Sequence, residues 1–500
     1  MLDRFDPDVD PTFPPVDPRR LAAALGAVLP PDRLILTTEG MRPYEADALA
    51  AYRSLPGAVA LPADASEVRA VLRVCRELGV PLVPRGAGTG LSGGALPYPG
   101  GVLMSFGKLS RILAIDPVAR TARVQPGVRN LAISEAAQPH GLFYAPDPSS
   151  QLACSIGGNV AENAGGVHCL KYGLTVHNIL ALQVETITGE TLHIGSEALD
   201  APGFDLMALM TGSEGLLGVV TEITVRLTPI PAEIRTLLAA FPSTRSAAQA
   251  VADIIAGGVT PAGLEMMDGL ALRAAEAYAH AGYPLDAEAI LICECDGEGA
   301  DADDETARVA EICRAAGAVQ IHQAKDEGER ARLWAGRKGA FPAMGRYAPD
   351  YYCIDGTIPR RCLPDVLTGI GDLARAHGLA VANVFHAGDG NLHPLILYDA
   401  GKPGELATAE TLGGAILELC VSVGGTITGE HGVGREKLNQ MCVQFTAAEL
   451  AAFAAIKAAF DPAGLLNPGK NIPSLPRCAE FGGLHVHRGQ VMPHADLPRF

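Results

Sequence analysis

Two histidines flank a predicted turn in the stretch Val381–Tyr398, whose sequence is VANVFHAGDGNLHPLILY. Apolar runs lie on both sides of Asp389-Gly390, a dipeptide that strongly favours a two-residue β-hairpin turn. With that turn, His386 and His393 lie directly opposite each other, with Cβ atoms about 5 Å apart on one face of the hairpin. Two neutral imidazoles in this arrangement can bind one divalent metal ion, such as zinc. The spacing alone leaves a second interpretation open, a hairpin that carries two incidental histidines.

The most glycine-dense segment of the chain is a second place where chemistry is expected. It runs from Arg85 to Gly94 with the sequence RGAGTGLSGG, directly after a predicted strand. Gly88, Gly90 and Gly93 match the spacing of the dinucleotide-binding fingerprint, but that fingerprint requires a helix to follow at once. The next residues, ALPYPGG, contain two prolines and cannot form this helix. Since successive backbone N–H groups can bind a phosphate without a helix, we expect an anion-binding loop, with a merely flexible turn as the alternative.

Two further clusters of small residues offer backbone and hydroxyl donors to a ligand. The first follows Tyr144 and includes SSQLACSIGGNVAENAGG, within which a helix is expected to begin. The second is Thr211–Gly215, TGSEG, shortly before a predicted strand at Val219–Leu227. We interpret both as candidate ligand-binding clusters.

Composition excludes several classes of partner. The 500 residues carry a net charge of −17, which argues against nucleic acid or an anionic membrane surface. The sequence contains no apolar run as long as a membrane span, and its acidic, proline-rich first residues are unlike a signal peptide, so we expect a cytoplasmic protein. The 11 cysteines include no C-x-x-C pair, which argues against an iron–sulfur cluster held by this chain alone.

The expected elements change character near Pro229, where closely spaced prolines indicate a domain boundary. Short strands and helices alternate before it. After it, residues 235–323 follow the order β-α-β-β-α-β, which is typical of a ferredoxin-like fold. The order β-α-β-β-α recurs over residues 351–423 and contains the histidine hairpin. A helix at Ala447–Phe460 and the segment Asp461–Lys470 are expected to return to the first domain. A chain of 500 residues is too long for one ordinary core and predicts two or three domains.

Several of these segments resemble a known family of flavoproteins. Pro84–Thr89, Ser149-Ser150, Ser155–Asn159 and Gly212–Gly215 resemble the FAD-binding domain of the vanillyl-alcohol oxidase type. The rest of the chain resembles the C-terminal domain of FAD-linked D-2-hydroxyacid dehydrogenases, most specifically at residues 333–343, 349–361 and 477–482. The resemblance implies an α+β fold with a two-part FAD-binding domain of the vanillyl-alcohol oxidase type and a ferredoxin-like α+β substrate (cap) domain.

The resemblance also implies a division of the chain. We expect an N-terminal extension that packs on the FAD domain, the FAD-binding domain, the substrate domain, a C-terminal return to the FAD domain, and a tail that contacts a partner, at residues 1–50, 51–230, 231–440, 441–476 and 477–500. Within the tail, Leu484–Arg488 is the candidate contact, and a plain C-terminal tail is the alternative.

Carried over to this sequence, the resemblance assigns a cofactor site. Family members with covalent flavin usually have a histidine near the position of Thr89, so FAD is expected to be bound non-covalently. The first glycine loop is expected to hold the pyrophosphate, and Asn467 and Lys470 to close over the flavin. The full expected set is Arg85, Gly86, Ala87, Gly88, Thr89, Gly90, Leu91, Ser92, Pro146, Ser149, Ser150, Cys154, Ser155, Gly157, Gly158, Asn159, Gly212, Glu214, Gly215, Val219, Val220, Asn467 and Lys470.

The resemblance assigns a metal and catalytic residues as well. In related enzymes the histidines of H-x-G-D-G-N-x-H and the glutamate of G-E-H-G bind a divalent metal, usually zinc, and His386, His393 and Glu430 occupy those positions. His431 matches the catalytic base, and Arg337 matches an arginine that binds the substrate carboxylate. The basic residue that D-2-hydroxyglutarate enzymes carry near the position of Cys353 is missing from this sequence. A monocarboxylate substrate is therefore expected.

The implied reaction is FAD-dependent oxidation of glycolate to glyoxylate, with hydride transfer from Cα to flavin N5 and assistance from the metal. D-lactate or another D-2-hydroxy monocarboxylate is the alternative substrate. Electrons would leave for another subunit, a quinone or oxygen. The resemblance favours a complex with an iron–sulfur subunit and a second flavin-type subunit, peripheral at the inner membrane. Two other classes stay open: a flavin-binding scaffold subunit with no active site, and a zinc hydrolase whose glycine loops are only structural.

Overall fold

The computed structural model describes residues 12–198 and 203–474, which form two compact units. The first unit comprises Met1–Ala164, Leu174–Pro229 and His431–Phe500, and the second comprises Gly165–Gly173 and Ile230–Glu430. The chain therefore changes units at 229/230 and 430/431, where boundaries at 230/231 and 440/441 were expected. The short segment Gly165–Gly173 also belongs to the second unit. The expected contact at Leu484–Arg488 lies outside the described residues.

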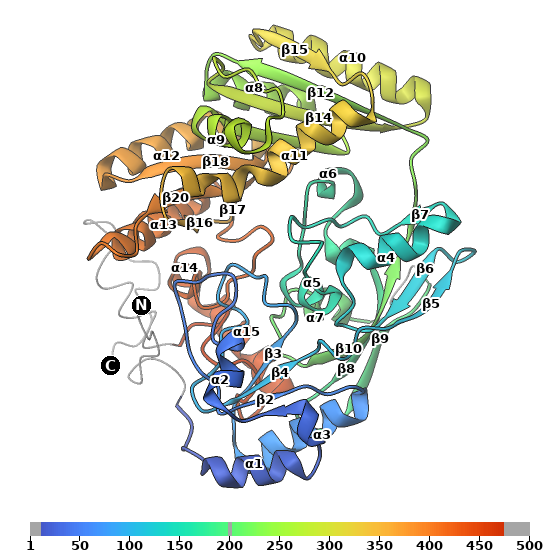
Figure 1. Cartoon of the computed structure of the whole chain (residues 1–500), viewed down its shortest axis with the longest axis vertical. Helices are drawn as coiled ribbons and strands as arrows, with labels where there is room; N and C mark the ends of the chain where they lie inside the picture. The colour runs from blue at the N-terminus through green and yellow to red at the C-terminus, as the bar shows by residue number, and fades with distance from the viewer. Residues whose placement is uncertain (1–11, 199–202, 475–500) are drawn as a thin grey trace. The chain divides into compact units, whose positions relative to one another are not determined.

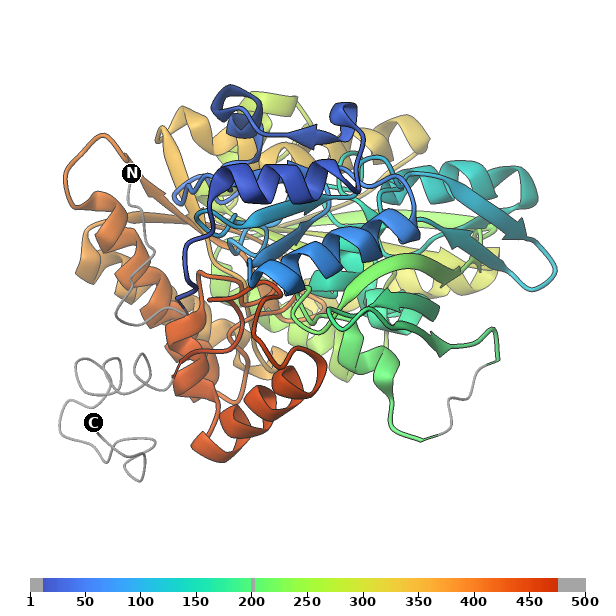
Figure 2. The same ribbon diagram turned by 90° about the horizontal axis from the view of Figure 1, so that it is seen from below.

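A small mixed sheet in the first unit carries the first glycine loop. Its strand order is β1 (Leu34–Ile35), β2 (Ala58–Ala60), β4 (Val102–Ser105), β3 (Leu82–Arg85), and β4 pairs in parallel with both β2 and β3. Helix α3 (Ala65–Leu78) begins after Asp64, which accepts the Glu67 N–H at 3.0 Å, and ends at Gly79 in the left-handed conformation. Helix α1 (Pro18–Gly26) packs beside α3 (Figures 1 and 2). Apolar side chains of α1, α3 and the sheet form one core.

A five-stranded antiparallel sheet completes the first unit. Its order is β5 (Ile112–Asp116), β6 (Thr121–Val124), β10 (Val219–Arg226), β8 (Ile179–Glu185), β9 (Thr191–Gly195). The first unit also contains a two-stranded pair and further helices: β7 (Leu142–Phe143), β11 (Thr228–Pro229), α2 (Thr38–Met41), α4 (Asn130–Ala137), α5 (Ile156–Glu162), α7 (Leu206–Met210), α14 (Leu438–Gln444) and α15 (Ala447–Phe460). Thr446 and Glu449 form a capping box at the start of α15, which has the predicted bounds. After residue 460 the chain runs back to β3, where Asn467 donates its N–H to the Leu82 carbonyl at 2.8 Å.

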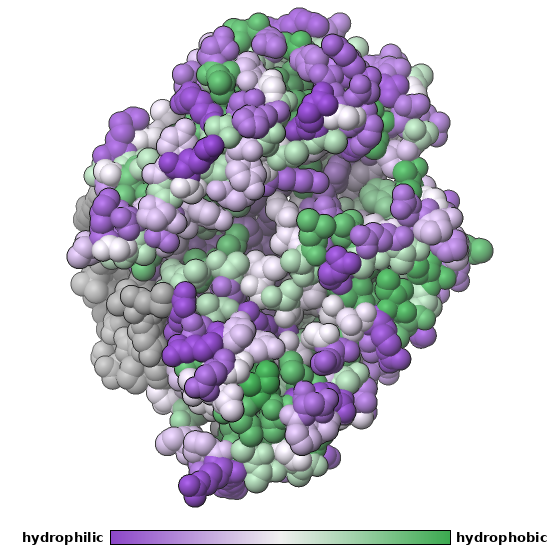
Figure 3. All heavy atoms as spheres, in the orientation of Figure 1, coloured by the Kyte–Doolittle hydropathy of each residue, from purple (hydrophilic) through white to green (hydrophobic). Residues whose placement is uncertain are grey.

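The second unit is built on one large sheet, and its first half has the predicted ferredoxin-like order. Strands β15 (Gln320–Gln323), β12 (Glu233–Phe241), β14 (Ala289–Gly297) and β13 (Gly263–Asp268) are neighbours in that order, and all three pairings are antiparallel. Helices α8 (Thr244–Ala256) and α10 (Gly299–Ala315) are the two crossovers (Figure 1). Helix α9 (Gly269–Ala279), between β13 and β14, was not predicted. Figure 3 shows mainly hydrophilic residues over α10 on the displayed face. Asp301, Asp303 and Asp304 of this helix are exposed.

The second β-α-β-β-α pass extends the same sheet. Strand β18 (Ala380–His386) pairs with β13 and with β20 (Pro394–Tyr398), and β20 pairs with β16 (Asp350–Cys353), all antiparallel. Short strands β17 (Gly356–Thr357) and β19 (Asn391–Leu392) lie at the end that carries the histidines. The helices are α6 (Cys169–Tyr172), α11 (Glu327–Ala343), α12 (Leu363–His377) and α13 (Glu405–Ser422). Helix α11 packs against α9 and β18, and its buried residues include Arg337.

None of the helices in the described ranges 12–198 and 203–474 is both long and apolar enough to cross a membrane.

Candidate active site

Three buried side chains of the second unit converge on one point. Nε2 of His386 lies 3.2 Å from Oε1 of Glu430, and Nε2 of His393 lies 3.3 Å from the same oxygen. The two imidazole rings have centroids 5.1 Å apart and are nearly perpendicular. Their ligand atoms all lie within 4.8 Å of one another.

The histidines meet through a different turn from the one predicted. His386 pairs with Asn391, and Ala387–Gly390 form a four-residue turn closed by a hydrogen bond from the Gly390 N–H to the Ala387 carbonyl at 3.2 Å. The prediction that His386 and His393 lie directly opposite each other is therefore wrong. Gly390 has φ +75°, and a Cβ there would lie 2.3 Å from the Ile358 carbonyl oxygen, so this position requires glycine. Other segments hold the turn, since Gly388 donates its N–H to the Leu264 carbonyl at 3.0 Å and the Gly390 carbonyl accepts the Ile358 N–H at 2.9 Å. Because Asn391 and His393 are two residues apart on one strand face, His393 still reaches His386 diagonally.

Glu265, on the neighbouring strand β13, supports this cluster. It lies directly opposite His386 in the β13–β18 register, and its Oε1 accepts a hydrogen bond from His386 Nδ1 at 2.7 Å. Its other oxygen, Oε2, accepts from Arg337 Nε at 2.8 Å. Arg337 on α11 is buried, so it is not an exposed arginine on the surface of the helix.

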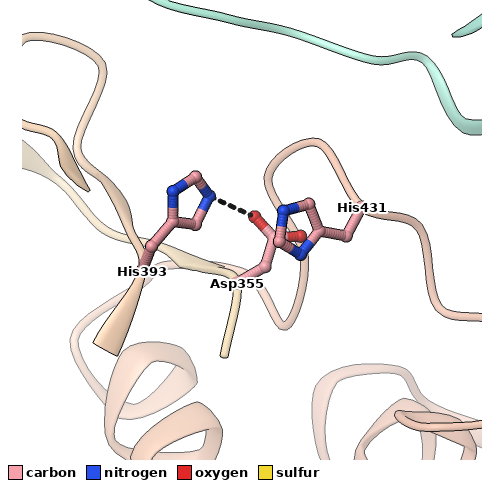
Figure 4. Close-up of side chains that lie close together, drawn as sticks. All are labelled: Asp355, His393 and His431. Atoms are coloured by element: carbon pink, nitrogen blue, oxygen red, sulfur yellow. Dashed lines mark ion pairs between the residues drawn. The ribbon is translucent and has the colours of Figure 1, made fainter. Parts of the chain in front are cut away.

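Asp355 holds the backbone that presents Glu430. Its carboxylate accepts the Thr428 hydroxyl at 2.7 Å, the Gly429 N–H at 3.0 Å and the Glu430 N–H at 3.2 Å. Oδ1 of Asp355 also lies 3.6 Å from His393 Nε2, and Figure 4 shows the two side chains directed at each other. His431, also labelled in Figure 4, is the first residue after the chain leaves the second unit.

The charges of the cluster depend on one another. Burial alone would raise the pKa of Glu430, but the charge of His386 and hydrogen bonds from both histidines hold this pKa well below its usual value. Burial opposes the charged form of His386, yet the neighbouring Glu265 and Glu430 raise its pKa well above the usual range. Burial raises the pKa of Asp389, in the turn, to about 7. This concentration of ionisable groups in a buried place is typical of a functional site.

The donor set and its spacing fit a divalent metal. Two imidazole nitrogens and one carboxylate oxygen are a common set for catalytic zinc, with bonds of about 2.0–2.1 Å. Tetrahedral geometry with such bonds places neighbouring ligand atoms about 3.3 Å apart, which agrees with the 3.2 and 3.3 Å separations from Glu430 Oε1. Because Nδ1 of His386 is held by Glu265, its Nε2 is the nitrogen directed toward the place where an ion would be bound.

The first glycine loop in the first unit keeps its backbone donors open. Within the described part of the chain, the N–H groups of residues 87–91 donate to no protein acceptor. Gly88 has φ +72°, and a Cβ there would lie 2.2 Å from Nη2 of Arg85, so the loop wraps closely around this guanidinium. A run of unused N–H groups in a glycine loop fits the phosphates of FAD. The predicted absence of a helix after the loop is confirmed, since β4 follows.

The other two small-residue clusters pack against this loop. A Cβ on Gly86 would lie 2.2 Å from Oγ of Ser155, the residue that caps α5. A Cβ on Gly215 would lie 2.3 Å from Cγ of Pro84, and the Gly212 N–H donates to the Val160 carbonyl at 2.8 Å. Segments far apart in sequence therefore meet at the end of β3, and only glycine allows these approaches.

Asn467 and Lys470 join the same place. Nδ2 of Asn467 donates to the Gly94 carbonyl at 3.0 Å and to the Glu214 carbonyl at 2.7 Å. Nζ of Lys470 donates to Oδ1 of Asn467 at 2.6 Å and to the Leu96 carbonyl. Burial lowers the pKa of Lys470 to about 7. The C-terminal return thus fastens the glycine loop.

Several predicted cofactor residues have protein partners of their own. Asn159 donates to Oδ1 of Asn130 at 2.8 Å, Gly157 packs against Pro126, and Arg85 donates to the Ala46 carbonyl at 2.8 Å. Pro146 and Cys154 are buried, Ser150 is half-buried, Ser149 is exposed, and Val219 and Val220 lie in β10. The backbones of the three glycine- and serine-rich clusters meet at one end of β3. The side chains named here also contact other parts of the protein.

The segment after Glu430 is bound to the glycine loop. Ser92 donates its hydroxyl to the His431 carbonyl at 3.0 Å, and its own carbonyl accepts the Arg435 N–H at 2.9 Å. Glu214 accepts the N–H groups of Val433 and Gly434, each at 2.8 Å. Since His431 follows Glu430 by one peptide bond, their Cα atoms are about 3.8 Å apart. The segment that begins at His431 is therefore fastened to the candidate cofactor loop within the first unit.

Sequence reasoning missed Glu265 and Asp355, and it interpreted Glu214 only as a cofactor contact. Each acts through partners distant in sequence, and only the strand register of β13 with β18 brings Glu265 to His386. Asp355 lies between β16, which ends at Cys353, and β17, which begins at Gly356, and a carboxylate between two strands is the signal that could have marked it.

Comparison with known proteins defines the class. Residues 56–195 match the model of an FAD binding domain, and residues 230–471 match the C-terminal domain of FAD linked oxidases. The chain belongs to this family of FAD-linked oxidases.

Particular relatives refine this result. The chain is 62% identical to the glycolate oxidase subunit GlcD of Escherichia coli K12, over 99% of both chains. It is 30% identical to a D-lactate dehydrogenase of Anaerostipes hadrus, over 88% of this chain and 94% of the relative. Among solved structures, p-cresol methylhydroxylase with substrate bound aligns over 93% of this chain and 99% of its own with a TM-score of 0.78 at 16% identity, which supports the fold alone.

Proposed function

We propose that this protein oxidises a small 2-hydroxy monocarboxylate, with glycolate, converted to glyoxylate, as the first candidate substrate. The relative at 62% identity is a glycolate oxidase subunit, and both FAD-related family models match. The observation that carries the mechanism is the convergence of His386 and His393 on Glu430 Oε1 at 3.2 and 3.3 Å.

Non-covalent FAD would be held by the backbone of residues 86–92 and the clusters that pack on it. When bound, FAD accepts a hydride at N5. Within its site, the N–H groups of residues 87–91 would bind the pyrophosphate, and Asn467 and Lys470 would hold the loop closed.

His386, His393 and Glu430 would hold a divalent metal, with zinc the first candidate. When bound, the metal lowers the pKa of the substrate hydroxyl. Arg337 would bind the substrate carboxylate, because Glu265 occupies one edge of its guanidinium and a second edge has further N–H donors. His431 would take the hydroxyl proton on an imidazole nitrogen.

These roles account for both hydrogens lost by the substrate. The O–H proton would go to His431, bound FAD would supply the acceptor for the Cα hydride, and the C–O bond would become a carbonyl. Electrons must then leave the flavin. Because the relative is a subunit and this chain has no C-x-x-C pair, we propose an iron–sulfur partner subunit at the inner membrane as the acceptor.

Anaerobic bleaching of the flavin by a panel of 2-hydroxy acids tests this function. Glycolate and D-lactate are expected to bleach the flavin and D-2-hydroxyglutarate is not, since Tyr352 and Cys353 in β16 offer no cationic partner for a second carboxylate. One methyl group separates glycolate from D-lactate, so their rates should differ by roughly 10–200-fold. A yellow protein that no 2-hydroxy acid bleaches would favour the scaffold subunit. A colourless protein without bound flavin would favour the hydrolase.

A further inference from the structure

Glu265 is the only carboxylate among the described residues to which both the candidate metal ligand His386 and Arg337 donate. Its Oε1 lies 2.7 Å from His386 Nδ1, while its Oε2 lies 2.8 Å from Arg337 Nε and 2.6 Å from Arg337 Nη2. All three side chains are at most 3% exposed. A charge buried this deeply needs partners, and each oxygen of Glu265 has a different one.

The position of Glu265 is set by the sheet. Residue 265 faces residue 386 across β13 and β18, and residues 264–266 of β13 are also paired with β14, so the carboxylate has little freedom to move. A hydrogen bond from His386 Nδ1–H to Glu265 leaves the lone pair of Nε2 for a metal. The same carboxylate fixes the Nε edge of Arg337 and so the direction of its remaining N–H groups.

We propose that Glu265 is a positioning residue that holds the metal ligand His386 and the carboxylate-binding Arg337 in register with each other. This inference rests on the proposed function. Loss of Glu265 would disturb both metal affinity and substrate binding, although the residue binds neither metal nor substrate itself.

The variant Glu265→Gln separates this role from a general need for a buried polar group. Glutamine has nearly the same shape, but its one acceptor oxygen cannot accept from both His386 and Arg337, and its NH2 group would face a second donor. Glu294 on the adjacent strand β14 provides a matched control. It is 1% exposed and accepts from Trp334 Nε1 at 2.7 Å, Arg330 Nε at 2.9 Å and Thr236 at 3.0 Å, away from the proposed ligands.

The experiment measures zinc affinity of the intact, flavin-containing protein by competition with a chromophoric chelator, and KM for glycolate. For Glu265→Gln we expect zinc affinity to fall by about 10–100-fold and KM to rise, with flavin content unchanged. Glu294→Gln should keep both values within about threefold of wild type. If Glu265→Gln does not fold, Glu265→Asp, which keeps the charge but shortens the reach, should show the same two changes to a smaller degree.

His386→Ala identifies which proposal fails. If wild type binds zinc, His386→Ala loses it and the Glu265 variants match wild type in zinc affinity and KM, the positioning role is wrong and the proposed metal site stands. If wild type and His386→Ala bind zinc equally weakly, the metal part of the proposed function is overturned together with this inference. Equal losses in Glu265→Gln and Glu294→Gln would also overturn it, because they would reflect fold stability alone.

Discussion

The two units recognise their candidate ligands by opposite means. The second unit concentrates charged side chains in a buried cluster, where Glu265, His386 and His393 are at most 3% exposed and the Glu430 side chain is 10% exposed. Each lies within hydrogen-bonding range of a partner. The first unit offers bare backbone: at the end of β3 the approaches between segments are so close that Gly86 and Gly215 leave no room for a Cβ. Substitutions that remove a functional group should therefore damage the charged cluster of the second unit. Substitutions that add volume should damage the glycine loop of the first unit.

Removal of the shared ligand is expected to have the largest effect. Glu430→Gln takes away the charge on which both histidines converge, so zinc affinity should fall by more than about 100-fold, beyond the usual loss for a supporting residue. The ratio of flavin absorbance at 450 nm to protein absorbance should not change. Zinc retained at wild-type affinity would exclude this cluster as the metal site.

Added volume in the glycine loop should weaken flavin binding and leave zinc affinity unchanged. In Gly86→Val the new side chain collides with Ser155 and Gly158, and overpacking of about 1–3 kcal/mol corresponds to roughly 10–100-fold weaker flavin binding. Flavin content after dialysis measures this loss, while zinc affinity should remain as in wild type. Gly26→Ala is the control, because nothing lies within 4 Å of its added Cβ. Full flavin content in Gly86→Val would show that the first glycine loop does not bind the flavin cofactor.

Glu214 tests the connection between the two regions. Its carboxylate binds the N–H groups of Val433 and Gly434, two and three residues after His431. Glu214→Ala should lower the rate of flavin reduction on the order of 10-fold by displacing His431, with zinc affinity close to wild type. Stopped-flow reduction of variants loaded with equal flavin measures it. An unchanged rate would remove the proposed role of Glu214 in holding this segment.

The smallest effect on either site is expected at Glu294, whose influence is on stability. Burial opposes its ionisation, but hydrogen bonds from His168 and Arg330 lower its pKa from 4.5 to about 2. A carboxylate with a lowered pKa stabilises the fold above its ordinary pKa and loses this contribution as pH falls from about 4.5 toward about 2, on the order of 3 kcal/mol in all. Urea unfolding of wild type and Glu294→Gln should therefore show a difference at pH 7 that narrows below pH 4.5. A difference independent of pH would contradict this assignment.

Sequence patterns predicted local elements and short-range chemistry well. The ferredoxin-like order of β12–β15, the bounds of α15 and the absence of a helix after Gly93 follow from periodicity, capping and proline positions. The nearness of His386 and His393 was predicted, but the turn between them was not, because Gly388 and Gly390 of the turn are hydrogen-bonded to Leu264 and Ile358, which are distant in sequence.

Residues that act across long distances in the chain could not be predicted in this way. Glu265 lies 121 residues before His386, and only the pairing of β13 with β18 places them opposite each other. The same holds for Glu214, which binds backbone 219 residues later. A strand with charged residues inside an apolar pattern, as in GLEMMD at residues 263–268, is a signal of a buried polar contact, although it does not name the partner.

We propose that His431 and the metal ligands His386, His393 and Glu430 act on glycolate, while the backbone of residues 86–92 holds FAD. Anaerobic flavin reduction by glycolate in wild type, His386→Ala and His431→Ala, each loaded with equal FAD, tests it most directly. Glycolate should bleach wild type, and both variants should stay yellow. Bleaching of either variant at the wild-type rate would contradict it.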